Sequence, residues 1–277
     1  MDIRIFDGCF AHIPYSLDGR DEPKNIKWQR GGPYRDITVY TDHYLPTAHL
    51  DQNDSRIQIA WLIEPSVVNT RGYEAVKKHH RYYDYILSHD RPFLAQFPKE
   101  KQVWVVSSSS FLYSPEWKLY PKSKLVLSVI GEKRRAIGHK LRYEMAAKLG
   151  HKMDIMGRGF KPFPIEKRAE IFAPYMYQVV IHNTNVPDYW SGILIDCFAT
   201  GTVPIVWGGS FLHKYFDMRG IILFDTLDQL EEILNEINER DYYSRATAIR
   251  DNFTMAFHMY RVTEDYMYDS FFKTLEK

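Results

Sequence analysis

The chain has 277 residues, of which 45% are hydrophobic and 15% aromatic, enough to bury one large core or two of moderate size. Its formal net charge of +1 excludes a general attraction to nucleic acid or membranes, so such a partner would need a local patch. The two cysteines, Cys9 and Cys197, are too few for a disulfide framework or a zinc site, and we expect two buried thiols.

The first half of the chain alternates short apolar runs with longer polar ones, which indicates an α/β fold. The N-terminal stretch MDIRIFDGCFAHIPYSL has no long apolar run, so it predicts neither a signal peptide nor a membrane anchor. We therefore expect a soluble cytoplasmic protein, in a bacterium or, if viral, in the host cell. The strands predicted in this half are residues 3–8, 36–41, 57–65, 83–90 and 102–108.

A second alternation follows residues 111–124, whose prolines and lack of periodicity favour a linker. The strands predicted there are 124–131, 152–159, 177–184, 202–209 and 220–225, and the helices are 138–150, 165–175 and 189–201. Helices are expected from residue 227 onward, with Asp228 as an N-cap. We predict two Rossmann-like domains facing a cleft, residues 1–120 and 121–255, with a C-terminal helix in 256–277 packing back on the first.

A basic loop follows the strand at 124–131, where doubly wound sheets bind their ligands. Glycines at a helix start allow a phosphate to approach the backbone N–H groups, and arginine can bind phosphate oxygens in a fork. This loop therefore predicts a diphosphate site, although a solvated basic surface would also explain it. Its polar residues are Lys133, Arg134, Arg135, His139, Lys140 and Arg142.

Two later loops add candidates at the same edge of the predicted sheet. Arg158 lies between two glycines, in either a nucleotide-binding loop or a plain turn. After the strand at 177–184 come polar and aromatic groups that can contact a ribose or a base, and each also has a structural explanation as a cap or a buried histidine. These candidates are His182, Asn183, Tyr189, Trp190 and Ser191.

The stretch YQVVIHNTNVPDYWSGILIDCFATGTVPIVWGG, together with IGEKRRAIGHKLRYE and DIMGRG upstream, resembles the donor-binding domain of the family 10 α-1,3-fucosyltransferases. The resemblance covers residues 124 to about 252 and is weak in the first half. It implies a two-domain glycosyltransferase of the B type (GT-B) that binds a nucleotide-sugar in the second domain, meets its acceptor mainly in the first, and needs no metal or other cofactor. By the same resemblance, Arg142 would neutralise the donor diphosphate, and Asn183 and Tyr189 would line the donor site.

Inverting sugar transfer requires a carboxylate that takes the acceptor proton and positive charge that holds the leaving diphosphate. IAWLIEPSVV faintly resembles the family's Glu-Ser-Pro segment, and on that basis we expect Glu64 to be the base. A local structural role for Glu64 is the competing interpretation. Asp7 and Asp42, each near a strand end, are the alternative bases.

The sequence also departs from the family pattern. The family's Tyr-x-Thr-Glu-Lys is replaced here by a stretch that lacks the acid and the lysine, with Gly192 and Ile193 in their places. Either the chain is a non-catalytic nucleotide-sugar-binding relic, or Lys133, Arg134, Arg135 and Arg158 hold the diphosphate instead. The donor can accordingly be a GDP-sugar or a UDP-sugar.

The acceptor is expected to meet two stretches of the first half, KWQRGGPYR and KKHHRYYDY, where cations alternate with aromatic residues. Such surfaces stack on sugar rings, and they also hold phosphate backbones and flipped bases. We expect a glycan acceptor. DNA carrying a 5-hydroxymethyl base is the alternative, although the near-neutral total charge argues weakly against it.

Overall fold

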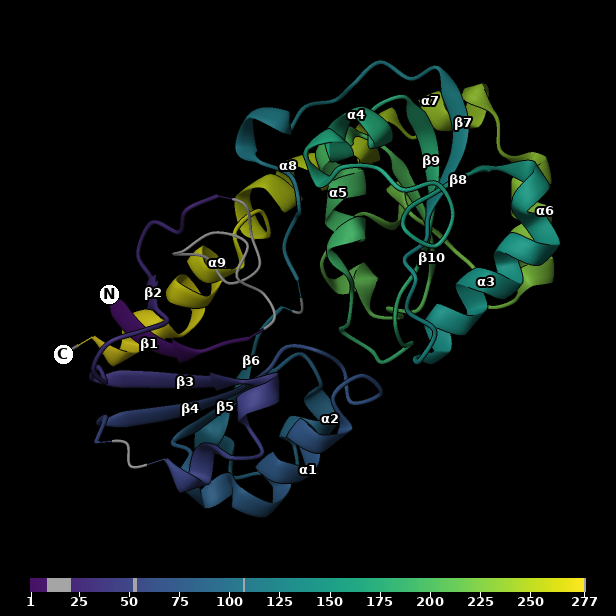
Figure 1. Cartoon of the computed structure of the whole chain (residues 1–277). Helices are drawn as coiled ribbons and strands as arrows, with labels where there is room; N and C mark the ends of the chain where they lie inside the picture. Colours follow the sequence, from purple (N-terminus) through teal and green to yellow (C-terminus); the bar gives the residue numbers. More distant parts are fainter. Residues whose placement is uncertain (9–20, 52–53, 107, 277) are drawn as a thin grey trace. The chain divides into compact units, whose positions relative to one another are not determined.

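The structure is a computed structural model, and it describes residues 1–8, 21–51, 54–106 and 108–276. The chain forms two compact units: unit 1 is Met1–Ser109 together with Val262–Lys277, and unit 2 is Ser110–Arg261. Each unit contains one sheet in which all paired strands are parallel (Figure 1). The α/β architecture with two Rossmann-like sheets is therefore confirmed.

Unit 1 contains a six-stranded sheet in the order β2-β1-β3-β4-β5-β6. Five of the strands overlap the predicted segments, and the three-residue β2 was not predicted. The strands are β1 (Asp2–Phe6), β2 (Lys27–Gln29), β3 (Ile37–Thr41), β4 (Ile57–Leu62), β5 (Tyr85–Ser88) and β6 (Gln102–Trp104), and the helices are α1 (Thr70–His79), α2 (Arg91–Leu94) and α9 (Thr263–Ser270).

Both faces of the unit 1 sheet are covered, which explains the nearly continuous apolar character of its strands. Val39 and Ile59 belong to a core cluster that includes Met267 of α9. Tyr40 and Ala60, their neighbours along β3 and β4, belong to a second cluster that includes residues of α1 and α2. Successive side chains of a strand point to opposite faces, so each strand supplies both clusters.

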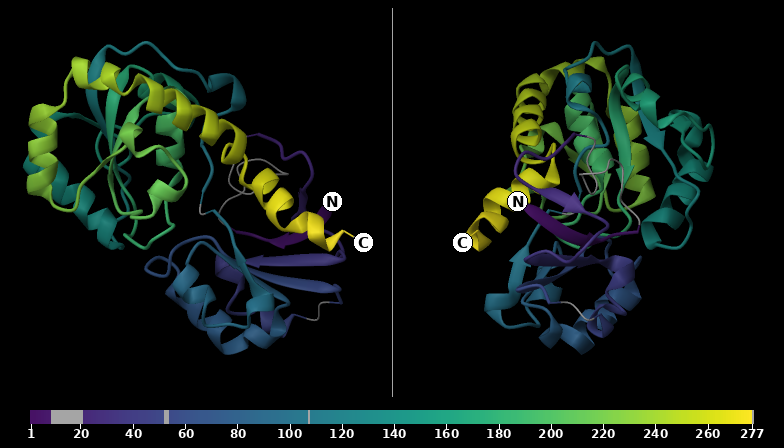
Figure 2. Two further views of the ribbon diagram at one scale, coloured as in Figure 1. Left: turned by 180° about the vertical axis from the view of Figure 1, so that it is seen from behind. Right: turned by 60° about the vertical axis from the view of Figure 1, so that its left-hand side comes forward.

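The C-terminal segment of the chain packs into unit 1, beside strands that come first in the sequence (Figure 2). Phe272 meets the ring of Trp28 edge-on, with ring centres 6.1 Å apart. The indole nitrogen of Trp28 donates to the carboxylate of the buried Glu264 at 3.1 Å. The segment that joins unit 1 begins at Val262, where the sequence analysis placed its start at 256.

Unit 2 contains a five-stranded sheet in the order β11-β10-β9-β7-β8. Every strand overlaps one of the predicted segments. The strands are β7 (Lys124–Val129), β8 (Asp154–Met156), β9 (Tyr175–Ile181), β10 (Val203–Trp207) and β11 (Ile222–Leu223), and the helices are α3 (Ile137–Leu149), α4 (Arg168–Phe172), α5 (Gly192–Thr200), α6 (Leu227–Glu236), α7 (Glu239–Ser244) and α8 (Ala246–Met259).

The centre of unit 2 is built from β9, β10 and α5, whose residues are nearly all buried. All seven residues of β9 are buried. Helix α5 ends at Gly201, whose φ of 72° is the left-handed conformation that glycine adopts at a helix C-terminus. Within α5 the thiol of Cys197 is fully buried, as expected, whereas Cys9 lies outside the described residues.

The predicted linker begins within unit 2 and packs against it. Asp196 of α5 accepts hydrogen bonds from the Ser110 hydroxyl at 2.7 Å and the Phe111 N–H at 2.8 Å. The ammonium group of Lys122 donates to the carbonyl oxygens of Ala173 and Thr200. These contacts attach residues 110–123 to the second sheet, so unit 2 begins at Ser110, where the sequence analysis placed the boundary at 121.

Two smaller features complete the description of the fold. Asp228 lies in the first turn of α6, and its predicted capping role is taken by Thr226, whose hydroxyl accepts from the Gln229 N–H. In the part of the chain that the structure describes, no helix combines the length and hydropathy needed to cross a membrane.

Candidate functional site

The candidate site lies at the carboxyl edge of the unit 2 sheet, where the loops that follow its strands meet. These are the loops at 130–136 after β7, 157–161 after β8, 182–191 after β9 and 208–211 after β10. In parallel doubly wound sheets this edge is where ligands bind. All predicted donor-site residues lie on these loops or on the first two turns of α3, whereas Glu64 belongs to unit 1.

The start of α3 is pressed directly against the loop after β9. A Cβ atom built on Gly138 would lie 1.7 Å from the carbonyl oxygen of His182. The Gly138 N–H donates to the carbonyl oxygen of Asn183 at 3.2 Å, so this N–H is already used within the protein. The glycine at this helix start therefore permits a close contact between two loops of the site.

A chain of hydrogen bonds joins three of the predicted donor-site residues. Arg142 Nε donates to the carbonyl oxygen of Ile181 at 2.8 Å, and its Nη2 donates to Asn183 Oδ1 at 3.0 Å. The amide of Asn183 in turn donates to the Tyr189 hydroxyl at 3.1 Å. Arg142 thus holds the carboxyl end of β9 in place, and in the described part of the chain its Nη1 has no hydrogen-bond partner.

His182 is fully buried beneath this network. Its Nδ1 accepts from the backbone N–H of Ser191 at 3.2 Å and also lies 3.2 Å from the Ser191 hydroxyl. Because Nδ1 is an acceptor, the proton of the neutral ring sits on Nε2, and among the described residues Nε2 has no hydrogen-bond partner. Burial, reinforced by the charge of Arg142, lowers the pKa of His182 to about 3, so the ring is neutral at pH 7.

His139 also forms part of the buried layer. Its Nδ1 accepts from the Ala136 N–H at 3.1 Å, which satisfies a backbone donor at the start of α3. Burial, followed by the charges of Arg142 and Lys133, lowers the pKa of His139 to about 4. We therefore assign the ring a supporting role, in which it fixes the loop that carries the predicted phosphate-binding cations.

These two histidines should make unit 2 sensitive to acid. Their unfolded pKa is about 6.5, so between pH 6.5 and 4 the unfolded chain binds protons that the folded unit does not. Stability is then full above pH 6.5 and falls by about 1.4 kcal/mol per pH unit for each histidine as the pH drops. This slope would be measured by urea unfolding at pH 7 and at pH 5, with hydrogen exchange used to monitor the unfolding of unit 2.

The control for the acid experiment is the exposed His213, also in unit 2. The slope of stability against pH should be shallower in His182→Gln and unchanged in His213→Gln. A slope as steep in His182→Gln as in the wild type would contradict the assignment of His182.

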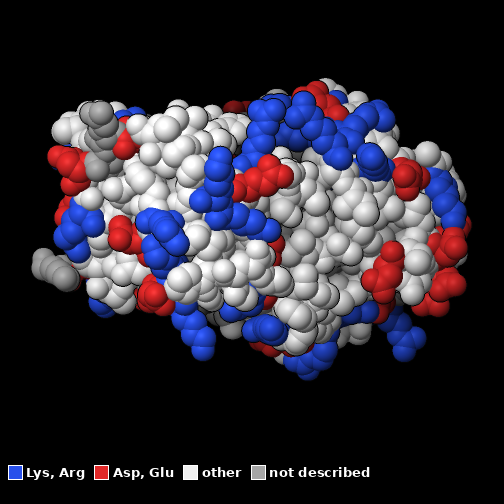
Figure 3. Space-filling model, turned by 90° about the horizontal axis from the view of Figure 1, so that it is seen from below, with Lys and Arg blue, Asp and Glu red and all other residues white. Residues whose placement is uncertain are grey.

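Exposed cations surround the buried layer on the loops after β7 and β8. Figure 3 shows Lys and Arg side chains gathered in a band on the face seen from below. The Arg134 guanidinium lies 3.6 Å from the centre of the Tyr143 ring, and Tyr143 stacks on Phe160 at 5.7 Å. The exposed cations of these loops and of the first turn of α3 are Lys133, Arg134, Arg135, Lys140, Arg158 and Lys161.

The loops after β9 and β10 lie in close contact, and some of their residues have a positive φ, which few residues adopt. Gly208 and Gly209 have φ of 90° and 69°, and a Cβ on Gly208 would lie 2.7 Å from the Thr184 carbonyl oxygen. Asp188, with φ of 64°, is the one non-glycine residue with positive φ among those described. The Tyr215 hydroxyl donates to its buried carboxylate at 2.6 Å. Such strain persists where the surroundings impose it, often at functional sites, and only the glycine pair was signalled by the sequence.

Trp190 does not join the site that its neighbours form. The sequence analysis treated it as able to stack on a base, but its side chain is fully buried. Its ring contacts Tyr215, Phe216 and Tyr260 at centre distances of 5.2–5.7 Å. The indole therefore belongs to the core of unit 2.

The candidate bases lie in unit 1, where Glu64 lies just beyond β4 and is separated from it by Ile63. The backbone N–H groups of Ile63 and Glu64 donate to the two oxygens of Asp42 at 3.2 and 3.3 Å, and the Asn69 amide donates to it at 2.8 Å. Burial, reinforced by the nearby charge of Glu64, raises the pKa of Asp42 to about 7. Asp42 thus anchors the loop that carries Glu64.

Asp7, the other alternative base, has a different environment. Its side chain is fully buried and pairs with Arg30 at 3.2 Å. A carboxylate held in this way is committed to a structural ion pair.

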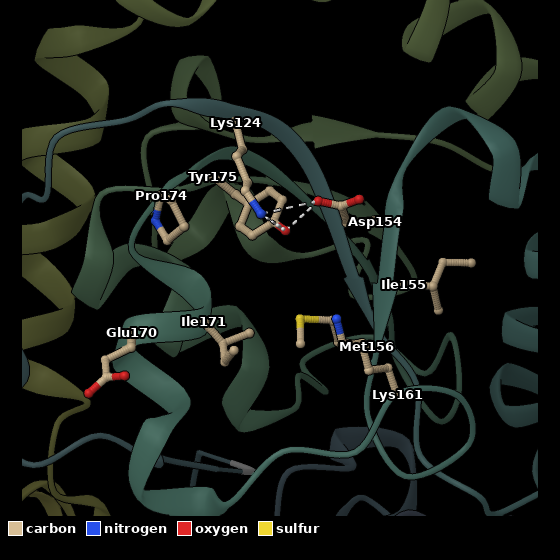
Figure 4. A pocket seen from close by; sticks show the side chains of 9 residues that line it. All are labelled: Lys124, Asp154, Ile155, Met156, Lys161, Glu170, Ile171, Pro174 and Tyr175. Carbon is tan, nitrogen blue, oxygen red and sulfur yellow. Dashed lines mark hydrogen bonds and ion pairs between the residues drawn. The ribbon is translucent and has the colours of Figure 1, made fainter.

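A separate pocket of about 380 Å³ in unit 2 contains none of the predicted residues. Lys124, Asp154 and Tyr175, the first residues of β7, β8 and β9, line it and point toward one another (Figure 4). The Tyr175 hydroxyl donates to Asp154 at 2.5 Å, and the Lys124 ammonium lies 3.6 Å from the same carboxylate. Lys124 and Asp154 are more than half exposed, so this pair contributes little energy and indicates no second site.

Comparison with known proteins places the fold. No protein-family model matches the sequence, and no curated protein sequence matches it. An α1,3-fucosyltransferase solved with GDP superposes with a TM-score of 0.58 at 13% identity, covering 99% of this chain and 89% of that one. The Anabaena protein Alr3699/HepE, solved with UDP-glucose, gives 0.62 at 12% identity over 87% and 78%.

A third solved structure matches along the full length of both chains. It is an α-glucosyltransferase in complex with UDP-glucose and DNA containing an abasic site, with a TM-score of 0.54 at 12% identity. The chain therefore has the GT-B glycosyltransferase fold. The resemblance to the α1,3-fucosyltransferases holds at the level of this fold.

Proposed function

We propose that the protein is an inverting, metal-independent glycosyltransferase that moves a sugar from a nucleoside diphosphate to a hydroxyl group of a glycan. One observation carries the proposal: exposed cations and a hydrogen-bonded polar network meet at the carboxyl edge of the unit 2 sheet. That combination suits a nucleotide-sugar, because a diphosphate needs positive charge and a ribose needs hydrogen-bonding partners. Similarity of fold to enzymes solved with GDP and UDP-glucose supports it.

In this proposal the side chains of unit 2 divide into two roles. The cations at 133–135 and Arg158 hold the diphosphate and neutralise the charge that develops as it leaves. Arg142 Nη1 adds a donor at the end of β9, and the buried His182 supports the Ser191 backbone from beneath. Tyr189, Asn183 and Ser191 line the nucleotide side.

The transfer itself needs one base. The carboxylate of Glu64 takes the proton of the acceptor hydroxyl while its oxygen forms a bond to the anomeric carbon. The bond from that carbon to the diphosphate oxygen breaks in the same step, and the nucleoside diphosphate leaves with the electron pair.

Nucleotide binding tests the proposal without knowledge of the acceptor. Calorimetric titration should show binding of UDP or GDP, and the double change Arg135→Ala with Arg158→Ala should raise the dissociation constant at least tenfold, since charge-assisted hydrogen bonds contribute about 1.5–3 kcal/mol each. Arg240→Ala is the matched control, because this exposed arginine lies on α7, which contacts the amino end of β9 through Tyr177. If neither UDP nor GDP bound, the proposed donor site would be contradicted.

A DNA acceptor remains a second candidate, and the surplus of exposed cations favours it. The loops after β7 and β8 and the first turn of α3 carry more cations than one diphosphate engages. If these cations contact a duplex, the affinity of the protein for that duplex should fall steeply as the salt concentration rises. The slope of the logarithm of the binding constant against the logarithm of the salt concentration should steepen by nearly one for each phosphate contacted. Titration of a duplex containing 5-hydroxymethylcytosine at 50 and 200 mM salt measures this slope. If the affinity for the duplex did not change with salt, the DNA acceptor would be rejected and only the glycan acceptor would remain.

A further inference from the structure

A second cavity, in unit 1, has a composition that the proposed donor site does not explain. It has a volume of about 270 Å³ and opens over β1 and β3 beside the turns at Asp42–Tyr44 and Ala48–Leu50. Its lining includes Phe6, Tyr40, Tyr44, Thr47, Leu50 and Asp51. Clusters of aromatic rings with one or two fixed polar groups are typical of small-molecule sites.

The aromatic rings that line this cavity differ in how far their faces are exposed to solvent. Phe6 stacks on Tyr40 with ring centres 4.9 Å apart and an angle of 7°, and the Arg4 guanidinium lies 4.7 Å from the Phe6 ring centre. Tyr44 is tilted by 55° to Phe6 and is 40% exposed. Leu50 beside it is 71% exposed. Tyr44 and Leu50 therefore present an apolar surface to solvent above an aromatic floor.

The polar group of the cavity is the carboxylate of Asp51. It accepts a hydrogen bond from the Tyr40 hydroxyl at 2.8 Å and another from the Tyr34 hydroxyl. Two tyrosines thus fix its orientation. A carboxylate offers about four acceptor positions, so others remain for hydroxyl groups of a ligand.

The two stretches singled out for the acceptor converge on this residue. Tyr34 comes from KWQRGGPYR and Tyr82 from KKHHRYYDY. The Tyr82 hydroxyl lies 3.5 Å from the backbone carbonyl oxygen of Asp51 and 3.3 Å from the Tyr40 hydroxyl. These segments are far apart in the sequence, and the fold brings Tyr34 to the carboxylate of Asp51 and Tyr82 to its backbone carbonyl.

We propose that this cavity binds a pyranose ring of the acceptor glycan, with its C–H face on Tyr44 and its hydroxyl groups donating to Asp51. A pyranose combines an apolar face with several hydroxyl donors, which matches an open ring beside an oriented carboxylate. A phosphate backbone fits poorly, because the charge of Asp51 repels it. As an acceptor site the cavity rests on the proposed function, whereas sugar binding in unit 1 stands by itself.

The test is binding of methyl glycosides of glucose, galactose and N-acetylglucosamine to the full chain, followed by saturation-transfer NMR. At least one glycoside should bind, with a dissociation constant raised tenfold or more by Tyr44→Ala and by Asp51→Asn, and little changed by Tyr44→Phe. Tyr243→Ala is the matched control, since this tyrosine is 55% exposed and lies in unit 2. Circular dichroism verifies that each variant is folded.

The outcomes separate this proposal from the donor site. Glycoside binding that is lost in Tyr44→Ala while UDP or GDP still binds supports both. Glycoside binding lost in Tyr44→Ala in a protein that binds no nucleotide supports the cavity and overturns the proposed function. Failure of all the glycosides, equal binding by Tyr44→Ala, or displacement of the glycoside by 5-hydroxymethyl-2′-deoxycytidine would overturn the cavity as a sugar site.

Discussion

Replacing Gly138 with alanine is expected to prevent unit 2 from reaching its native structure. The added Cβ would lie 1.7 Å from the His182 carbonyl oxygen, which belongs to a backbone fixed by β9. Relief would require the start of α3 to move away and break the bond from Gly138 N–H to Asn183. Overpacking of this kind costs about 3 kcal/mol or more.

Gly131→Ala is the matched control for that experiment, because a Cβ at Gly131 meets nothing within 4 Å. Both glycines flank the same basic loop, so the pair compares close approach with open space. Urea unfolding of the two variants, with calorimetric titration of UDP and GDP, measures stability and the donor site together. If Gly138→Ala unfolded at the wild-type urea concentration, the contact between α3 and the loop after β9 would be wrong.

Glu64→Gln is expected to lower the transfer rate by about 10²- to 10⁴-fold, the range over which a general base acts. The amide has nearly the same shape, so the dissociation constant of the donor nucleotide should stay as in the wild type. The measurement is the turnover number with a working acceptor, alongside calorimetric titration of UDP or GDP. Loss of turnover with unchanged nucleotide binding would separate chemistry from donor recognition.

Glu74→Gln is the control for the base, since this exposed glutamate lies on α1 of the same unit. Full turnover in Glu64→Gln would remove Glu64 as the base and direct attention to Asp42. Asp42→Asn alone is less informative, because Asp42 also holds the N–H of Glu64. Its loss would displace Glu64 even if Asp42 never accepts the proton.

The elements that the sequence predicted well are those whose pattern is local. β9 is buried along its whole length and, apart from Gln178, is built of apolar and aromatic residues, as a parallel strand covered on both faces requires. Gly201 ends α5 in the left-handed conformation that glycine tolerates best. The meeting of the loops after β7, β8, β9 and β10 follows from parallel strand order, because all carboxyl ends of such strands lie at one edge.

The features that could not be predicted from the sequence depend on contacts between residues far apart in the chain. β2 has three residues, too few to show a period, and Trp28 within it is buried by Phe272 of the C-terminal segment. Trp190 looked available for a ligand because its immediate neighbours are polar, but Tyr215, Phe216 and Tyr260 enclose it. No local pattern identifies such partners.

The roles of the candidate site residues were only partly accessible from the sequence. The basic loop and the polar stretch at 182–191 were recognised from residue types. That Arg142 would hold the carbonyl of Ile181, and that His182 would be sealed beneath Ser191, depends on packing between α3 and β9. Residue type indicates which groups can bind a ligand. Only the fold shows which atoms of those groups are already used within the protein and which remain available to the ligand.

The division of unit 1 between the two ends of the chain has a consequence for biosynthesis. Val262–Lys277 supplies Met267 and Phe272 to the core that surrounds Trp28 and Trp61, so the ribosome must translate unit 2 before that core can close. Until then an apolar face of the first sheet stays open on the nascent chain, where it can attract chaperones or other nascent chains. Unit 2 is continuous in sequence and can fold during translation, so the protein is expected to mature from its middle outward.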